Sequence, residues 1–150
     1  MFSSSRDRVT DRTDPAVNEQ IRLRMEMRLA YFQNHPERIN QRLEELDREW
    51  DVERMLETGS SALTLGGLLL GVARSRKWLL VSLTVQVFFA QHAVQGWCPP
   101  LPVLRRLGFR TEYEIELERY ALKALRGDFQ ELPKSSESRG TSPVLEAVRR

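Results

Sequence analysis

The chain has little cysteine and histidine: Cys98 is its only cysteine, and it has two histidines in 150 residues. A single cysteine excludes an intramolecular disulfide. Cys98 and His92 alone do not make a metal site, because such sites need three or four ligands. The N-terminus carries acidic residues and no apolar core, so we expect neither a secretory signal nor a transit peptide. With no catalytic constellation in view, the sequence predicts a protein that is not an enzyme and uses no cofactor.

Charged residues are absent from a long central stretch. Lys, Arg, Asp and Glu make up 29% of the chain, yet residues 58–73 and 78–104 contain none. The two uncharged runs are joined by the polar turn Arg74-Ser75-Arg76-Lys77. Two apolar runs around a short turn indicate a helical hairpin, and we expect a lipid bilayer to surround it. The first run would be about 24 Å long as a helix.

No positive surface is indicated either. The formal net charge is +2, and basic and acidic residues alternate along the chain. A nucleic-acid binder concentrates its positive charge on one face. We therefore expect no nucleic-acid partner.

Small residues recur on the first apolar run. Gly67 and Gly71 form a G-x-x-x-G pair, and Ser60 with Thr64 forms a second small pair at the same spacing. Such pairs let membrane helices approach closely. We favour a contact within the hairpin over a contact between two chains.

Polar and aromatic residues mark the ends and one face of the second run. The cations Arg74, Arg76 and Lys77 must reach headgroups or water, and Trp78 and Trp97 suit the two membrane interfaces. Polar side chains on the second run should hydrogen-bond to a neighbouring helix; they are Gln86, Gln91, His92 and Gln95. The functional alternative is that His92 and Gln95 line a path or small site in an oligomer.

The flanks predict helical arms. From Ala16 apolar residues recur at helical spacing, and Pro36 breaks the helix. The next helix, 36–57, carries a narrow apolar stripe of Ile39, Leu43, Leu46 and Trp50. Prolines 99, 100 and 102 favour an extended exit from the hairpin. Thr111 and Glu114 form a capping box for a last helix, 112–126, with a broad apolar face that includes Ile115, Leu117, Tyr120, Leu122 and Leu125.

The predicted fold class is all-α: a two-helix transmembrane hairpin flanked by amphipathic helices, with disordered termini. The segments are a disordered N-terminus (1–15), an amphipathic arm of two helices (16–57), the membrane hairpin with its Pro-rich exit (58–104), a C-terminal amphipathic helix (105–131) and a mostly disordered tail (132–150).

The hairpin and its end resemble the YgaP-like transmembrane domain family of small bacterial inner-membrane proteins. In that family a Gly-aromatic-Cys-Pro motif ends the hairpin, as Gly96, Trp97, Cys98 and Pro99 do within GWCPPLPVLRRLG. The resemblance covers about residues 55–110, and the flanks NHPERINQRLEELDREWDVERMLET and RTEYEIELERYALKALRGDF look like those of longer members. Some members carry a rhodanese domain, which implies sulfur or thiol chemistry nearby. This chain has no α/β region of that size.

Three functions remain open. The first is a structural or accessory protein, multi-pass in the bacterial inner membrane, that self-associates as a homo-oligomer or binds a protein partner on its charged arms. The Arg and Lys distribution favours both termini in the cytoplasm. The second is a membrane-interface thiol or persulfide relay at Cys98, activated by Arg105 and Arg106. The third is a soluble helical bundle that buries the hairpin.

Overall fold

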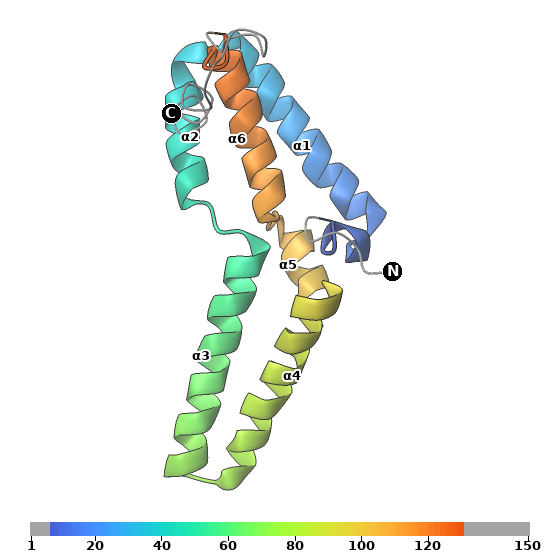
Figure 1. Ribbon diagram of the computed structural model, residues 1–150, viewed down its shortest axis with the longest axis vertical. Coiled ribbons are helices and arrows are strands. Elements are labelled where there is room, and N and C mark those ends of the chain that lie inside the picture. Colours follow the sequence, from blue (N-terminus) through green and yellow to red (C-terminus); the bar gives the residue numbers. More distant parts are fainter. Residues whose placement is uncertain (1–6, 131–150) are drawn as a thin grey trace, which may run out of the picture. The chain divides into compact units, whose positions relative to one another are not determined.

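The computed structural model describes residues 7–130, which are helical and contain no strand. The expected all-α class is confirmed. The α-helices are α1 Pro15–Asn34, α2 Ile39–Arg48, α3 Val52–Ala73, α4 Leu79–Gln95, α5 Leu101–Leu107 and α6 Glu112–Arg126 (Figure 1). Short 3-10 helices lie at Thr10–Arg12, Pro36–Arg38 and Arg76–Trp78.

These helices belong to two compact units. The first unit comprises Met1–Leu23 and Trp50–Ile115, and the second comprises Arg24–Glu49 and Glu116–Arg150. Two of the boundaries therefore fall inside α1 and α6, and the third falls between α2 and α3. The expected disordered tail, 132–150, lies outside the described residues, as do residues 1–6.

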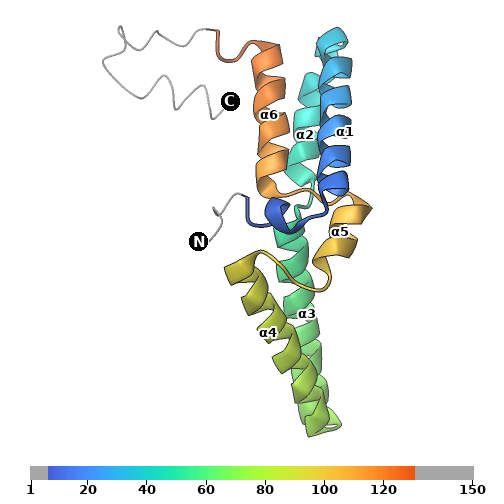
Figure 2. The same cartoon turned by 90° about the vertical axis from the view of Figure 1, so that its right-hand side faces the viewer.

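In the first unit, α3 and α4 lie side by side and run in opposite directions (Figures 1 and 2). The 3-10 helix Arg76–Trp78 forms the turn between them, and the Ser75 hydroxyl caps that turn by accepting from the Lys77 amide at 3.4 Å. Gly96 ends α4 with φ of 72°, a left-handed conformation that glycine adopts without strain.

The single helix expected over residues 36–57 is divided in the structure. The chain leaves the helix at Glu49, and α3 begins at Val52, six residues before the uncharged run that begins at residue 58. Asp51 caps α3 by accepting from the Arg54 amide at 2.5 Å. An Asp cap satisfies one of the free amides of a first turn, which makes this a favoured start.

The expected disorder of the whole N-terminus is also wrong for its described part. The segment from Asp7 to Asp14 forms a 3-10 turn at Thr10–Arg12, and Val9 is buried. The Arg8 guanidinium donates to the Ala93 carbonyl in α4 at 2.7 Å. The buried Val9 and hydrogen bonds to distant residues hold this segment, and neither feature has a periodic sequence signal.

The Pro-rich exit is helical rather than extended. Pro100 and Pro102 lie at the start of α5, whose first-turn amides need no partner within the helix. Residues 105–107, which we assigned to the C-terminal helix, belong to α5. The expected capping box of α6 is confirmed, since the Thr111 amide donates to Glu114 Oε2 at 2.8 Å and the Glu114 amide donates to Thr111 Oγ1 at 3.2 Å.

The second unit consists of parts of α1 and α6 with the whole of α2. Its buried apolar side chains are Phe32, Ile39, Leu43, Leu46 and Leu122. The predicted stripe on α2 is therefore buried as far as Leu46. Trp50 is not part of it, because α2 ends at Arg48 and Trp50 is exposed beneath the Arg54 guanidinium. The broad face expected on α6 is also narrower, since Leu117, Tyr120 and Leu125 are exposed.

Candidate functional site

Small residues make the contact between α3 and α4. A Cβ atom on Gly67 would lie 2.4 Å from Ser82 Oγ and 3.1 Å from the Trp78 carbonyl oxygen. A Cβ atom on Gly71 would lie 2.4 Å from a methyl carbon of Leu79. Both glycines are buried here, so the G-x-x-x-G pair serves contact within the chain, as the sequence predicted.

Thr64 adds hydrogen bonds to the same contact. Its carbonyl oxygen accepts from Ser82 Oγ at 3.0 Å, and its hydroxyl accepts from Gln86 Nε2 at 2.8 Å. The expectation that Gln86 bonds to a neighbouring helix is confirmed. Ser60, the other member of the small pair, instead donates to the Glu57 carbonyl in its own helix at 3.1 Å.

The large apolar side chains of the two helices point outward. Val72 is 90% exposed and Leu69 is 70% exposed, although both lie within an uncharged stretch. The other exposed large apolar residues of α3, the turn and α4 are Leu63, Leu65, Leu68, Leu70, Trp78, Leu79, Leu80, Val81, Leu83, Val87, Phe88 and Val94. The pair thus has small residues inside and large apolar residues outside, the reverse of a water-soluble helix pair.

By length and composition, one helical stretch among the described residues can cross a membrane. It is Pro36–Ala73, whose apolar window has mean hydropathy 1.3 and is only 17% buried. The apolar part of this stretch belongs to α3. A core helix of a soluble protein would be mostly buried at such hydropathy.

His92 is buried at the C-terminal end of α4, only 4% exposed. Neither of its ring nitrogens has a hydrogen-bond partner within the described part of the chain. The neighbouring segment passes close to the helix end, where a Cβ atom on Gly96 would lie 2.4 Å from the Arg8 carbonyl oxygen. Gln95, which we grouped with His92, is exposed, so the two do not form one buried polar site.

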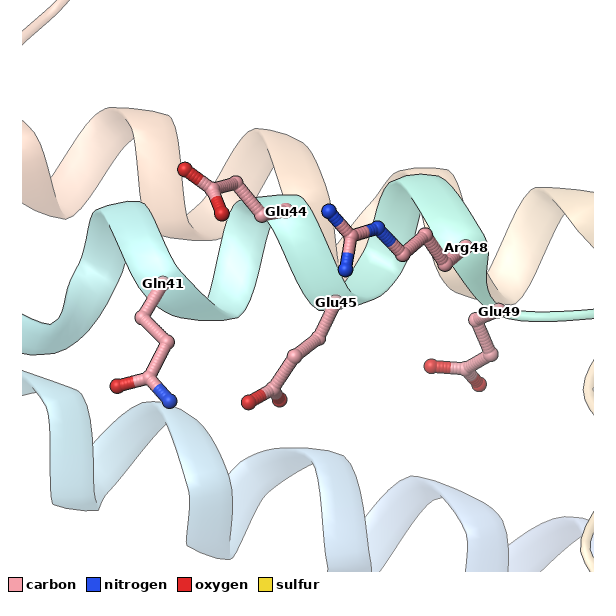
Figure 3. A pocket seen from close by; sticks show the side chains of 5 residues that line it. All are labelled: Gln41, Glu44, Glu45, Arg48 and Glu49. Carbon is pink, nitrogen blue, oxygen red and sulfur yellow. The ribbon is translucent and has the colours of Figure 1, made fainter.

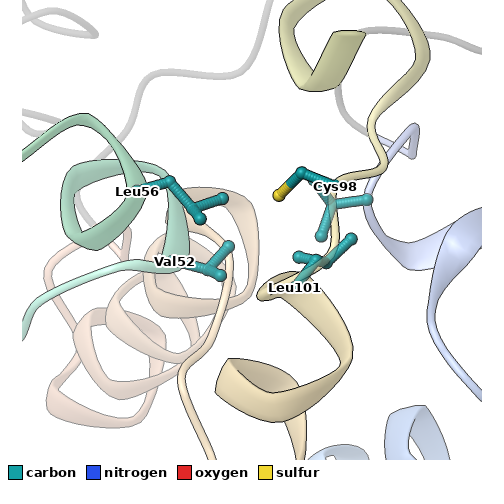
Figure 4. Packing of buried hydrophobic residues seen from close by; sticks show 5 residues of the cluster. Val52, Leu56, Cys98 and Leu101 are labelled. Atoms are coloured by element: carbon teal, nitrogen blue, oxygen red, sulfur yellow. The ribbon is translucent and has the colours of Figure 1, made fainter. Parts of the chain in front are cut away.

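Cys98 is buried in a small apolar cluster with Val9, Val52, Leu56 and Leu101 (Figure 4). Trp97 packs against this cluster, which gives it a structural contact at the end of α4. Burial raises the pKa of the Cys98 thiol above its ordinary value. A reactive thiol needs the opposite change, because the thiolate is the nucleophile.

Arg105, one of the two cations that the thiol hypothesis places near Cys98, has hydrogen-bond partners elsewhere. It is buried and forms two hydrogen bonds to the Glu114 carboxylate, at 2.7 and 2.8 Å. It also donates to Thr13 Oγ1 at 3.2 Å, to Asn18 Oδ1 at 2.9 Å and to the Phe109 carbonyl at 3.1 Å. These bonds use the guanidinium fully and join the N-terminal segment and α1 to α5 and α6.

A second buried ion pair holds the second unit together. The Glu118 carboxylate is fully buried and accepts from Arg28 at 3.1 and 2.9 Å and from Arg42 at 3.0 Å. Arg42 also donates to Glu45 at 3.0 Å. Arg119 pairs with Asp47 and Glu116. Helices from three parts of the sequence are thus connected through charged groups.

Polar side chains of α2 line a hollow on the surface of this helix. The hollow, of about 440 Å³, is lined by Gln41, Glu44, Glu45, Arg48 and Glu49, which all project from this one helix or its end (Figure 3). The described residues contain no group of three or more metal-ligating side chains.

The three cations of the turn, Arg74, Arg76 and Lys77, and the nearby Trp78 are exposed.

The sequence reasoning missed Ser82 as a packing residue, and it missed the hydrogen-bond partners of Arg105. Ser82 is a small polar residue within an apolar run. Its contact with Gly67 in space depends on the geometry of the turn between α3 and α4, which the sequence pattern does not give. Arg105 has partners more than eighty residues away, which no local pattern indicates.

Comparisons of the chain with protein-family models, curated proteins and solved structures find no match.

Proposed function

We propose that the chain is a small multi-pass membrane protein in which α3 and α4 form a transmembrane hairpin and the remaining helices form an arm outside the bilayer. The observation that supports this is the arrangement of the helix pair, with Gly67, Gly71 and Ser82 inside and large apolar side chains outside. Membrane helices associate through small residues because lipid solvates their large ones. In water the same surface would be a large exposed apolar patch.

The lengths of the two helices fit this proposal. The uncharged part of α3 spans residues 58–73, and α4 has 17 residues with a 3-10 turn before it. At about 1.5 Å per residue each covers about 25 Å, close to a hydrocarbon core of about 30 Å. The cations of the turn and the charged start of α3 would then reach the two headgroup regions.

For the arm we propose a non-catalytic, accessory role in binding a protein partner or a second copy. Its charged side chains form a connected network around Glu118 that fixes the helices of the second unit. The thiol relay at Cys98 is disfavoured, because the thiol is buried and its pKa is raised. Placement in a bacterial inner membrane and membership of the YgaP-like family remain parts of this proposal.

Extraction of membranes with alkaline carbonate tests the hairpin. We expect the protein to stay in the pellet and to be released by mild detergent. Leu65→Arg places a charge on the exposed side of α3 at the middle of the uncharged run, where it costs about 3 kcal/mol in a membrane, and should shift protein to the carbonate supernatant. Met27→Arg is the matched control, because Met27 is a similarly exposed apolar residue in the second unit. Release of the unaltered protein by carbonate alone would contradict the proposal.

A further inference from the structure

An apolar cavity lies in the first unit between α3, α4 and the start of α5. Its volume is about 370 Å³. The lining comes from the first half of α3, the second half of α4 and the segment from Cys98 to Leu104. Leu63 and Phe88 line it and are also exposed, so the cavity opens onto the apolar outer surface of the helix pair.

The lining offers almost nothing to a polar ligand. Ser60 and Cys98 carry its only polar side-chain atoms, and the Ser60 hydroxyl already donates to the Glu57 carbonyl. Apolar cavities stay dry, and an engineered one of about 150 Å³ binds benzene. On that scale the present cavity has room for roughly 15 carbon atoms. The size and chemistry fit a single alkyl chain.

We propose that this cavity binds one acyl chain of a bilayer phospholipid. The proposal rests on the membrane hairpin proposed above, because the cavity continues the surface that would face lipid. An acyl chain needs no directional hydrogen bond, and it would cover Leu63 and Phe88 at the opening.

Two glycines of α3 give a matched pair of variants. A Cβ atom on Gly59 or on Gly66 would meet no atom within 4 Å, so either position can accept a side chain without a clash. Gly59 lines the cavity and Gly66 does not. Gly59→Leu therefore occupies cavity space, while Gly66→Leu makes the same chemical change elsewhere on the same helix.

The test uses the full chain in phosphatidylcholine vesicles that contain a phosphatidylcholine with a photoreactive diazirine in one acyl chain. After illumination, the labelled residues are mapped by mass spectrometry. We expect adducts concentrated on cavity residues such as Met55, Phe89 and Leu104. Their yield should fall about tenfold in Gly59→Leu, because the leucine fills the space, and should be unchanged in Gly66→Leu.

Each other outcome overturns the inference. Equal cavity labelling in both variants would mean that the lipid touches only the outer surface. Displacement of the label by free oleate would assign the cavity to a free fatty acid, and cross-links between two copies at these residues would assign it to a protein contact. Failure of the protein to float with the vesicles would instead contradict the membrane hairpin, so the two proposals fail separately.

Discussion

At the scale of single residues, the ion pair of Arg105 and Glu114 connects several segments of the first unit. The Arg105 side chain is fully buried, and the Glu114 side chain is 16% exposed. An unpaired buried charge is costly, so each residue depends on the other. Together they join segments from both ends of the first unit through Thr13 and Asn18.

This pair predicts a loss of stability in acid. Burial alone raises the pKa of Glu114, but the hydrogen bonds and charge of Arg105 outweigh it and hold the pKa below its ordinary value. A depressed folded-state pKa stabilises the fold above the unfolded pKa of about 4.3 and stops doing so as the pH falls through the folded value. We expect the unfolding temperature in detergent, followed by circular dichroism, to fall as the pH is lowered below about 4.3.

Substitution separates this effect from general acid sensitivity. Glu114→Gln should lower the stability at pH 7 by about 3 kcal/mol, because Arg105 loses its countercharge, and should flatten the acid-dependent loss. Glu44→Gln, at an exposed position of α2, should keep the unaltered pH profile. Identical profiles for the two variants would show that the pair does not control acid stability.

At the scale of helices, the contact between α3 and α4 depends on glycine residues on the side of α3 that faces α4. We predict that Gly67→Leu separates the helices, because its Cβ atom alone would lie 3.1 Å from the Trp78 backbone oxygen and 2.4 Å from Ser82 Oγ. Overpacking of this kind costs about 1–3 kcal/mol. The thermal midpoint in detergent should fall for Gly67→Leu and stay or rise for its neighbour Gly66→Leu. Equal midpoints would mean that the helices do not pack through Gly67.

Helices with local signals were predictable, and those fixed by distant contacts were not. The capping residues Thr111 and Glu114 placed the start of α6 correctly, and Pro36 placed the break after α1. The break at Asp51 was missed because the charged pattern of α2 continues across it. The buried N-terminal segment and the cavity were missed because each depends on residues that meet only after folding, such as Arg8 with Ala93. Sequence also predicted the Gly67 contact, but not its partner Ser82.

At the scale of the whole molecule, the proposed hairpin places its turn and its arm on opposite sides of the membrane. The turn has three cations, whereas Arg48, Arg54, Arg105, Arg106 and Arg110 flank the other end of the spans. Orientation follows the number of Lys and Arg residues near the spans rather than net charge, so the ion pair of Arg105 does not remove it from this count. The larger number favours the arm, with both termini, in the cytoplasm.

Cysteine labelling can test this orientation, because the chain has one native cysteine to remove. In a Cys98→Ala background, Ser75→Cys reports on the turn and Gln41→Cys on an exposed position of α2. With a membrane-impermeant maleimide on intact spheroplasts, we expect Ser75→Cys to be labelled and Gln41→Cys to be labelled only after lysis. The Cys98→Ala background alone should remain unlabelled. Labelling of Gln41→Cys before lysis would reverse the orientation, and labelling of both sites before lysis would show that the two helices do not cross the membrane as a pair.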